Sequence, residues 1–263
     1  MVDGYPAFAP ALAVANEGFA DHYFSDLVKL ETGHFWFESR NKLLVQVLRD
    51  HFPDFKSFLE IGCGTGFVLS GLRAQFANAS FSGSEIFSAG LSYASDRMPS
   101  TELFQMDARQ IPFRDEYDVV GAFDVLEHIE EDEEVLRQMY QAVRPGGGIL
   151  ITVPQHPALW SAADDYAFHK RRYTRSELVS KVRSAGFEPV RVTSFVSILL
   201  PLMFASRLRH RQLNEDYDPV SEFQINPILN NCLHAIMGVE RLLIRFASVP
   251  VGGSLLVAAV RRH

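Results

Sequence analysis

The sequence predicts an α/β protein whose core is a doubly wound, mostly parallel β-sheet. Short apolar runs bounded by turn residues alternate along the chain with segments of helical spacing, as expected when strands and helices alternate. The first of these runs, at residues 58–61, continues through three glycines into a helical segment at 67–76. A strand, a glycine turn and a helix in this order open a nucleotide-binding βα unit. The chain has 263 residues, of which 47% are hydrophobic, so it can bury one large core.

The composition argues against several classes of protein. With 25 basic and 32 acidic residues the net charge is −7, which disfavours broad contact with a phosphate backbone, so no nucleic-acid partner is expected. Two cysteines, Cys63 and Cys232, can form neither a disulfide framework nor a metal cluster, and a reducing, cytoplasmic location fits best. Residues 1–20 lack the basic start of a secretory signal. The apolar run at 195–205 falls well short of the roughly 20 residues that span a bilayer, so no transmembrane segment is expected.

An acidic residue and three glycines lie close together at the end of the first strand. Glu60 precedes Gly62, Gly64 and Gly66 in the pattern E-x-G-x-G-x-G. Glycines at these positions allow a sharp turn and a close approach by a ligand. The carboxylate would repel a pyrophosphate, but it suits a cationic ligand. A tight turn that binds nothing is the alternative interpretation.

This segment resembles the first motif of the class I S-adenosylmethionine-dependent methyltransferases. The resemblance implies a Rossmann-like sheet of seven strands, mostly parallel, with an antiparallel last strand. It also implies the cofactor S-adenosyl-L-methionine, with its methionine part against the glycines and its ammonium group near Glu60. The resemblance covers residues 58–195 and the final strand, and the leading helices match more loosely.

Residues 21–52 have helical spacing, with an aromatic cluster at 34–37 that is followed by Arg40. The cluster either packs over the sheet or covers the cofactor, with Arg40 reaching the cofactor's carboxylate. In many related methyltransferases a similar leading segment ends in an arginine that closes over the methionine carboxylate. The resemblance therefore makes Arg40 a candidate cofactor-binding residue.

Acids also stand at the ends of the second and third predicted strands. Glu85, followed by Ile86, ends the second strand, where one carboxylate can accept hydrogen bonds from both ribose hydroxyls of a nucleoside. Asp107 and Ala108 follow the third strand. In the family an acid at this point meets the exocyclic amine of adenine, and the apolar residues after it help to hold the ring. A surface acid in the first case and a turn aspartate in the second are the alternatives.

The fourth strand, at 117–124, is apolar through its middle, as a buried parallel strand should be. It ends in Phe123 and Asp124, and the segment that begins at Asp124 resembles the D-x-L-E-H segment of small-molecule methyltransferases. The resemblance implies that this loop forms the floor of the site beneath the transferable methyl group, with Phe123 and Asp124 against the cofactor. The acids at 130–134 suit the positive N-terminal dipole of the next helix and have a structural interpretation.

A glycine turn at 144–148 leads into the fifth strand at 149–153, and a polar and aromatic loop follows at 154–173. A loop that leaves the carboxyl end of a central strand overhangs the ligand crevice of a doubly wound sheet, so the methyl acceptor is expected to meet this loop. A capping box that begins at Thr174 starts the next helix, and Gly186 ends it.

An insertion separates the last two strands. Strand six is expected at 187–195 and strand seven at 254–260, whereas a hairpin loop usually has about 2 to 5 residues. The insertion is expected to be a helical cap or lid. Its apolar and basic character permits contact with a membrane surface or a lipid-linked substrate, although packing against the core or a second copy is at least as well supported. Its features are the apolar stretch at 198–204, the basic residues Arg207, Arg209, His210 and Arg211, an acidic turn at 215–218 and a helix at 228–246.

These boundaries divide the chain into four segments. Leading helices at 1–55 cover the cofactor site, and residues 56–195 form the S-adenosylmethionine-binding core. The insertion occupies 196–253, and residues 254–263 carry the final strand of the core. The oligomeric state does not follow from the sequence.

Methyl transfer from a sulfonium is an in-line displacement, so the main task is to hold the acceptor against the methyl carbon. A hydroxyl acceptor also benefits from a base, and His128, His156 and His169 are candidates because imidazole titrates near neutrality. His128 lies nearest the expected methyl position, although a structural histidine at a helix start is an equally good interpretation. The sequence thus predicts transfer to a small-molecule acceptor, in the first place a hydroxyl oxygen of a quinone precursor, a sugar or a lipid-linked glycan.

Three other hypotheses stay open. Asp124, Glu127 and His128 could bind a divalent ion together with a loop histidine, as in some small-RNA and quinone-precursor O-methyltransferases, although the favoured interpretation includes no metal. A non-catalytic scaffold that binds the cofactor is disfavoured by the intact acids and glycines. A nicotinamide-dependent oxidoreductase is disfavoured by the acid before the glycines and by the missing G-x-G-x-x-G spacing.

Overall fold

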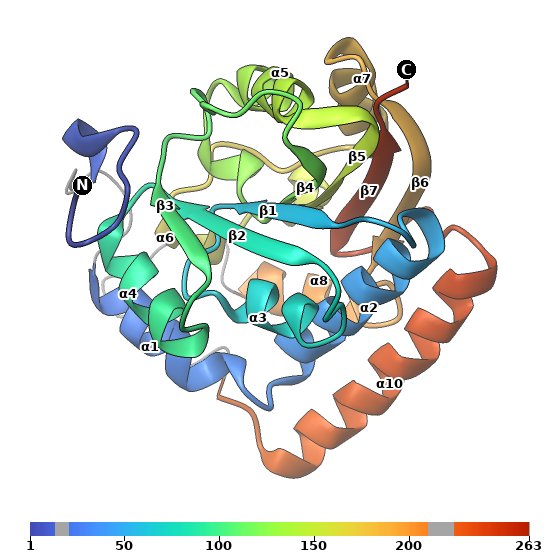
Figure 1. The fold of residues 1–263 in the computed structure, drawn as a ribbon. Helices are drawn as coiled ribbons and strands as arrows, with labels where there is room; N and C mark the ends of the chain where they lie inside the picture. Colours follow the sequence, from blue (N-terminus) through green and yellow to red (C-terminus); the bar gives the residue numbers. More distant parts are fainter. Residues whose placement is uncertain (14–20, 210–223, 263) are drawn as a thin grey trace.

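The computed structural model describes residues 1–13, 21–209 and 224–262. Its strands are β1 (Ser57–Ile61), β2 (Ser80–Glu85), β3 (Glu102–Gln105), β4 (Tyr117–Phe123), β5 (Val143–Pro154), β6 (Glu188–Phe195) and β7 (Ser254–Val260). Within the described residues these form one sheet in the order β3-β2-β1-β4-β5-β7-β6 (Figure 1). β7 is antiparallel to both of its neighbours, and the other neighbouring strands pair in parallel. The predicted α/β, Rossmann-like fold with an antiparallel last strand is confirmed.

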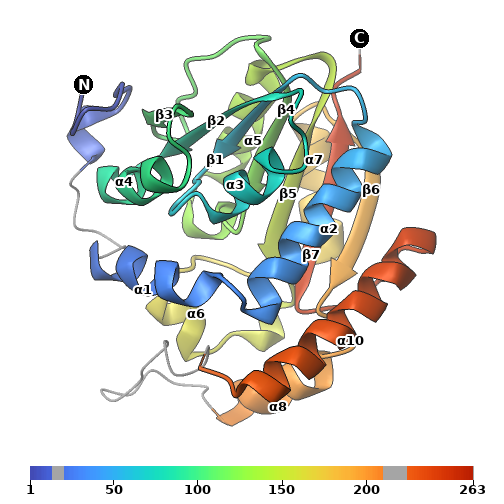
Figure 2. The same ribbon diagram turned by 60° about the horizontal axis from the view of Figure 1, so that its bottom comes forward.

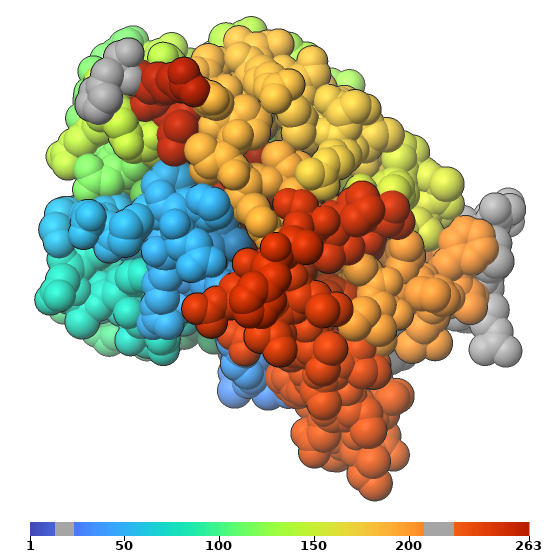
Figure 3. Space-filling model, turned by 90° about the vertical axis from the view of Figure 1, so that its right-hand side faces the viewer, coloured from blue at the N-terminus to red at the C-terminus, as the bar shows by residue number. Residues whose placement is uncertain are grey.

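Helices cover both faces of the sheet. The α-helices are α1 (Asp21–Glu31), α2 (Phe35–His51), α3 (Phe67–Arg73), α4 (Ser88–Arg97), α5 (Asp132–Ala142), α6 (Ala162–Tyr166), α7 (Arg175–Ser184), α8 (Leu200–Arg209) and α10 (Pro227–Phe246). In Figure 1, α5 and α7 lie over one face, whereas α2, α3 and α4 lie over the other. Figure 2 shows α10 on the outer side of α2, and Figure 3 shows it crossing the surface of the molecule. The helical part of the insertion therefore packs beside the leading helices.

The sheet is apolar on both faces because alternate side chains of its strands point to opposite sides. On β1, Phe58 joins the core beneath α2 and α3, and the next residue, Leu59, joins the core beneath α5 and α7. On β5 the same alternation sends Leu150 to the first core and Ile151 to the second. Burial on both sides explains why these strands read as continuous apolar runs in the sequence.

The glycine-rich residues 144–148, which were expected to form a turn, instead belong to β5. A register shift between Tyr117 and Val119 accommodates them in the pairing with β4. A Cβ atom on Gly148 would lie 2.5 Å from the ring of Phe52, and one on Gly147 would lie 2.3 Å from the carbonyl oxygen of Asp118. Gly147 and Gly148 are thus required because a carbonyl group and a ring pass too close for side chains, and the expected turn is instead an irregularity within β5.

The loop at 154–173 also contains a short helix that the sequence analysis did not predict. The side chain and backbone of Ser161 and the side chain of Asp164 form a reciprocal capping box at the start of α6. The next helix, α7, begins as expected, since the hydroxyl of Thr174 accepts from the backbone N–H of Glu177 at 3.2 Å. Gly186 has a φ of 101° directly after this helix, which favours glycine.

The N-terminal segment and the insertion complete the described chain. The side-chain oxygen of Gln105 accepts from the backbone N–H of Ala9 at 3.1 Å, so residues near the N-terminus lie along β3. None of the described helices has the length and hydropathy that crossing a membrane requires. His210, Arg211 and the acidic turn expected at 215–218 lie outside the described residues.

Candidate cofactor and acceptor site

The glycine loop after β1 forms the centre of the candidate site. Gly62, Gly64 and Gly66 have φ values of 65°, 50° and 73°, in the left-handed region that favours glycine. A Cβ atom on Gly62 would lie 2.6 Å from Cγ2 of Val125, and one on Gly66 would lie 2.9 Å from Cβ of Ala94. Backbone conformation therefore favours glycine at all three positions, and close packing excludes a side chain at two of them.

A buried acid and a buried arginine face this loop. Glu60 is 2% exposed, and its burial raises its pKa well above the usual value, a shift that the charge of Arg40 opposes. Arg40 comes from α2, lies 4.4 Å above the centroid of the Trp36 ring and forms an ion pair with Asp124. Among the described residues, Oε2 of Glu60 and Nε of Arg40 are buried without a hydrogen-bond partner. The site thus holds one acceptor and one donor that the described protein atoms leave unsatisfied.

Glu85 ties the end of β2 to the glycine loop. Its Oε2 accepts from the backbone N–H of Gly64 at 3.0 Å, and its Oε1 accepts from that of Ile86 at 2.8 Å. Burial raises the pKa of Glu85, and these backbone hydrogen bonds oppose the shift. Oε1 also accepts from the backbone N–H of Phe87 at 3.4 Å, so a lone pair for a further hydrogen bond remains on Oε2. Ile86 is itself tied to β3, since its carbonyl oxygen accepts from the side-chain amide of Gln105 at 2.9 Å.

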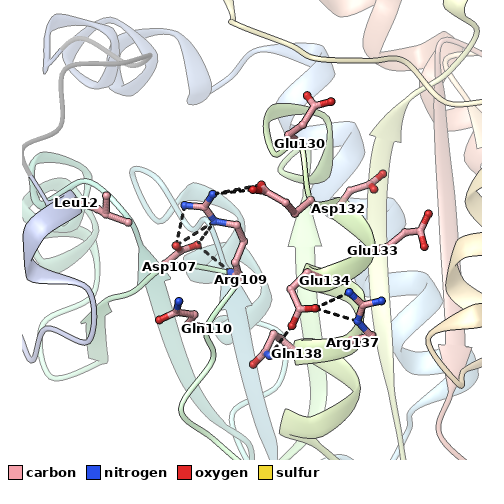
Figure 4. A pocket seen from close by; sticks show the side chains of 11 residues that line it. Leu12, Asp107, Arg109, Gln110, Glu130, Asp132, Glu133, Glu134, Arg137 and Gln138 are labelled. Carbon is pink, nitrogen blue, oxygen red and sulfur yellow. Dashed lines mark hydrogen bonds and ion pairs between the residues drawn. The ribbon is translucent and has the colours of Figure 1, made fainter.

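Asp107 lies at the end of β3, where it is bound by an arginine (Figure 4). Nη2 of Arg109 donates to its Oδ2 at 2.9 Å, and Nε donates to its Oδ1 at 3.0 Å. Arg109 also reaches Glu131 at 3.2 Å. Ala108 is buried beside them. Asp107 and Arg109 line a cavity of about 960 Å³ together with the acids Glu130, Glu131, Asp132, Glu133 and Glu134.

Asp124 is held in a strained backbone conformation at the end of β4. Its φ is 56°, which is unusual for a residue with a side chain. Its backbone N–H donates to the carbonyl oxygen of Thr152 at 2.9 Å, and the Thr152 hydroxyl donates to Oδ1 at 3.3 Å. These bonds and the ion pair with Arg40 direct the carboxylate toward α2. Phe123, the residue before it, is buried in the core.

A second group of polar side chains lies beyond Asp124. Ligand atoms of Glu127, His128 and His169 all lie within 4.8 Å of one another. Glu127 is fully buried, and neither of its carboxylate oxygens has a partner on another described residue. Burial, and next the charge of Asp124, raise the pKa of Glu127 well above its usual value. Burial and the neighbouring His169 lower the pKa of His128 to about 3, so His128 is neutral at physiological pH.

Asp164 orients His169 through one ring nitrogen, Nδ1. Its Oδ1 lies 2.8 Å from Nδ1 of His169 and accepts from Nε of Arg172 at 2.7 Å. Burial would raise the pKa of Asp164, but the bonds to His169 and Arg172 outweigh it and lower the pKa to about 2. Asp164 is therefore ionised, and it fixes the ring of His169, whose centroid lies 4.7 Å from that of His128.

His156 lies outside this group. It adopts a φ of 63°, and its backbone N–H donates to the carbonyl oxygen of Tyr173 at 2.9 Å. Among the described residues its buried Nε2 has no hydrogen-bond partner. Burial, and next Arg172, lower the pKa of His156. The structure therefore brings together His128 and His169 of the three candidate histidines.

Sequence analysis missed several residues that build the site. The hydroxyl of Thr65, inside the glycine loop, donates to Oε1 of Glu31 at 2.7 Å. Arg97 from α4 also reaches this buried glutamate, at 2.6 Å. Nothing in the local pattern of α1 indicates that Glu31 has partners so distant in sequence. Asp164 was detectable, because Ser161 and Asp164 have the spacing of a capping box.

The comparisons with known proteins agree with this geometry. A protein of Mycolicibacterium smegmatis named as a probable S-adenosylmethionine-dependent methyltransferase is 28% identical over 59% of this chain and 60% of its own length. A dTDP-4-amino-2,3,4,6-tetradeoxy-D-glucose N,N-dimethyltransferase of Saccharopolyspora spinosa is 27% identical over 55% of this chain and 57% of its own. A ubiquinone biosynthesis O-methyltransferase of Pseudomonas putida is 25% identical over 62% and 75%. The chain thus spans less than two thirds of the first two of these relatives.

Solved structures share the fold at lower identity. Phosphoethanolamine N-methyltransferase 2 of Haemonchus contortus, in complex with S-adenosyl-L-methionine, superposes with a TM-score of 0.62 at 17% identity, over 93% of this chain and 58% of that one. The [4+2]-cyclase SpnF superposes with a TM-score of 0.59 at 16% identity, over 92% and 95%. The sequence profile of a family described as a methyltransferase domain matches residues 33–192, more than half of the chain. The protein therefore belongs to the class I S-adenosylmethionine-dependent methyltransferase family.

Proposed function

We propose that the protein transfers a methyl group from S-adenosyl-L-methionine to a hydroxyl oxygen of a small molecule. The observation that carries the cofactor assignment is the buried pair of Nε of Arg40 and Oε2 of Glu60, which lack partners among the described residues. A buried polar atom without a partner costs free energy, so a ligand that satisfies both atoms is favoured here. An amino-acid end does this, because its carboxylate accepts from Arg40 and its ammonium group donates to Glu60.

The strand ends beside this pair suit the rest of the cofactor. Gly62, Gly64 and Gly66 keep side chains away from the bound methionine part. Glu85 accepts a ribose hydroxyl through the lone pair that its backbone bonds leave on Oε2. Ile86, Asp107 and Ala108 flank the adenine at the next strand end, which is supported by their positions just after the paired strands β2 and β3.

The charge of the site suits a cationic ligand. When bound, S-adenosyl-L-methionine supplies an electrophilic methyl group on a positively charged sulfur. Glu60, Glu85 and Asp124 surround the site with carboxylates that favour a cation there. Phe123 contributes an apolar wall beside Asp124. Arg40 remains ion-paired with Asp124 through Nη1 while it offers Nε to the ligand carboxylate.

The acceptor side favours oxygen because it contains an oriented base. In the proposed reaction His169 accepts the proton of the acceptor hydroxyl, and the ionised Asp164 stabilises the resulting imidazolium. His128 and His156 line the acceptor side without taking the proton. The relative from Pseudomonas putida, named as an O-methyltransferase, supports oxygen, whereas the relative from Saccharopolyspora spinosa is named as an N,N-dimethyltransferase.

Transfer of a labelled methyl group tests this function. The full chain is incubated with methyl-labelled S-adenosyl-L-methionine and a panel of phenols, sugar alcohols and primary amines. We expect label in hydroxyl compounds. Label in amines alone would remove the oxygen assignment, and the absence of any labelled product would favour a scaffold that only binds the cofactor. Calorimetric titration with S-adenosylhomocysteine and with NAD separates the cofactor classes, and tight binding of NAD alone would exclude the proposal.

A metal-assisted O-methyltransferase is the second candidate. It is supported by the close approach of Glu127, His128 and His169, and by the carboxylate of Glu127, which lacks a partner on another described residue. Asp124, which sequence analysis included in this set, instead bonds to Arg40 and Thr152. One carboxylate and two imidazoles are a donor set that fits a divalent transition metal, which would orient two acceptor hydroxyls.

Metal removal distinguishes the two candidates. If a metal takes part, dialysis against a strong chelator abolishes methyl transfer and Mn²⁺ or Zn²⁺ restores it. Calorimetric titration of the chelator-treated protein with Mn²⁺ would then show one site that Glu127→Gln removes. Activity that survives chelation would exclude the metal-assisted candidate and support the mechanism in which His169 acts as the base.

The remaining assignments are parts of the same proposal. Residues 1–55 act as a cover of the cofactor, 56–195 and 254–263 as its binding core, and 196–253 as a helical cap. A reducing, cytoplasmic location is supported by the free thiols of Cys63 and Cys232. A nucleic-acid partner remains disfavoured by the net charge of −7.

A further inference from the structure

Helix α10 is apolar on two opposite faces. Its inner face buries Leu233, Met237 and Ile244 against the core beside α2. Its outer face carries another apolar row at spacings of four and three residues, which keeps the row on one side of a helix. The exposed members of this outer row are Ile228, Cys232, Ala235, Val239, Leu242 and Phe246.

The outer row is well exposed. Ile228 is 75% exposed and Phe246, at the other end of α10, is 79% exposed. A helix that is apolar all round normally lies buried, so a helix with a second apolar face in solvent indicates a further contact. No described segment of the chain covers this row. We call it the outer stripe of α10.

Helix α8 extends the apolar surface. Leu202 is 61% exposed, and Ile198 and Phe204 are also exposed. The segment that leads into α8 is bound to α10, because Oε2 of Glu240 accepts from the backbone N–H groups of Ser197 and Ile198 at 2.7 and 2.8 Å. Figure 3 shows α8 and α10 on the same face of the molecule, where they form one continuous surface.

The charges on these two helices are almost all basic. Arg207 belongs to α8, and Arg241 and Arg245 belong to α10. The one acid on either helix, Glu240, is buried at the contact described above. The exposed charge on this surface is therefore positive, although the whole chain carries −7. Anionic headgroups complement such a surface, whereas a second copy of the chain would bring the same arginines to it.

We propose that α8 and the outer stripe of α10 form a docking surface for an anionic lipid bilayer. In this arrangement α10 lies in the plane of the membrane with its outer stripe in the boundary between headgroups and acyl chains, and Arg241 and Arg245 contact lipid phosphates. Nη1 of Arg207 donates to the hydroxyl of Ser161 at 2.9 Å, so the docked surface adjoins the acceptor-side loop. The surface contains no residue of the cofactor site, so its test is independent of methyl transfer.

Vesicle sedimentation with the full chain tests the proposal. We expect binding to vesicles that contain phosphatidylglycerol, weaker binding at high salt, and little binding to vesicles of phosphatidylcholine alone. Replacing two exposed apolar side chains in the variant Leu242→Ser, Phe246→Ser should weaken vesicle binding by roughly tenfold or more. Arg245→Glu should weaken binding to anionic vesicles alone. Val190→Ser, which removes an exposed apolar side chain from β6, is the matched control and should bind as the wild type does.

Circular dichroism and thermal melting check that the variants fold, and exposure of the replaced side chains predicts unchanged melting. Cys232 lies on the outer stripe and is exposed, whereas Cys63 is buried, so an environment-sensitive fluorophore can be attached to Cys232. Its emission should shift to the blue with anionic vesicles if the stripe enters the bilayer. The proposal would be overturned if the wild-type protein did not bind anionic vesicles. It would also be overturned if sedimentation equilibrium showed that the protein instead dimerises through α10.

Discussion

The cofactor half and the acceptor half of the site are built in different ways. On the cofactor half, Glu60, Glu85 and Asp107 each stand at or directly after the end of a parallel strand, so the sheet brings together what the sequence separates. On the acceptor half, His169 depends on Asp164 and on the conformation of a loop. The proposed function of the first half follows from topology, and that of the second follows from contacts within one loop.

Asp164 on the acceptor half and Glu60 on the cofactor half also differ in whether their carboxylate oxygens have hydrogen-bond partners. Asp164 is fully engaged by His169, Arg172 and the backbone of Ser161, and its pKa falls to about 2. Glu60 keeps an unpartnered oxygen, and its pKa rises well above the usual value. Asp164 is therefore stabilised by its protein partners, whereas Glu60 would gain a partner from a ligand. Substitutions in each half should thus produce distinct effects on turnover and cofactor affinity.

The largest expected effect is on turnover. Replacing His169 with Gln removes the proposed base, and the loss of general-base catalysis should lower kcat about 10²- to 10⁴-fold. Affinity for S-adenosylhomocysteine should stay unchanged, because His169 belongs to the acceptor half. Steady-state kinetics and calorimetry measure the two quantities. An equal loss of cofactor affinity would show that the halves are not separate.

The next effect is on cofactor affinity. Glu60→Gln keeps the shape of the side chain but removes the charge that we propose to face the ammonium group. Loss of a charged hydrogen bond of about 1.5 to 3 kcal/mol should weaken binding of S-adenosylhomocysteine roughly 10- to 100-fold. Glu188→Gln, at an exposed position on β6, is the control and should bind normally. Unchanged affinity in Glu60→Gln would remove this carboxylate from the cofactor site.

A smaller effect is expected from two glycine substitutions, which distinguish a glycine required for cofactor binding from a glycine required for folding. Gly64→Ala and Gly186→Ala both place a side chain at positive φ, at a cost of about 1 to 2 kcal/mol in unfolding free energy. Gly186→Ala should lose more stability, because its Cβ would lie 2.7 Å from the Tyr140 ring, whereas that of Gly64 would lie 3.9 Å from the Phe24 ring. Only Gly64→Ala should weaken cofactor binding. The same affinity loss in both variants would show a general effect of instability.

The smallest effect is on the pH dependence of stability without ligand. Since the pKa of folded Glu60 is raised from 4.5, its stabilising contribution is present below pH 4.5 and is lost as the pH rises through the folded pKa. Glu60→Gln should therefore gain stability relative to the wild type between pH 4.5 and neutrality.

Asp164 should show the opposite sign. Its folded pKa is lowered from 3.8 to about 2, so its contribution is present above pH 3.8 and is lost as the pH falls through about 2. Asp164→Asn should be less stable than the wild type at neutral pH, by a margin that shrinks in acid. Urea unfolding across this pH range measures the difference in unfolding free energy between each variant and the wild type. If this difference changed with pH in the same direction for both variants, the contrast between Glu60 and Asp164 would be contradicted.

Most of the fold could be predicted because its signals are local. The apolar run at 254–260 coincides with β7, and the glycine spacing after Glu60 locates the turn between β1 and α3. The structure of residues 144–148 was not predicted correctly. Gly147 and Gly148 are required there by close contacts with Asp118 on β4 and with the Phe52 ring, and the local sequence pattern does not reveal these contacts.

The site was predictable only where topology determines it. Parallel strands place Glu60 and Glu85 at the same edge of the sheet, so their approach could be inferred. The ion pair between Arg40 and Asp124 and the bond between Thr65 and Glu31 join side chains from distant elements, and only the packing of α1 and α2 over the sheet creates them.

The central claim is that Arg40 and Glu60 bind the amino-acid end of the cofactor. Calorimetric titration of the wild type and Glu60→Gln with S-adenosylhomocysteine and with 5′-methylthioadenosine, which lacks that end, tests it most directly. We expect Glu60→Gln to lose affinity for S-adenosylhomocysteine and to keep its affinity for 5′-methylthioadenosine, because Glu60 meets a group present in the first ligand alone. An equal loss for both ligands, or no loss for either, would contradict the account.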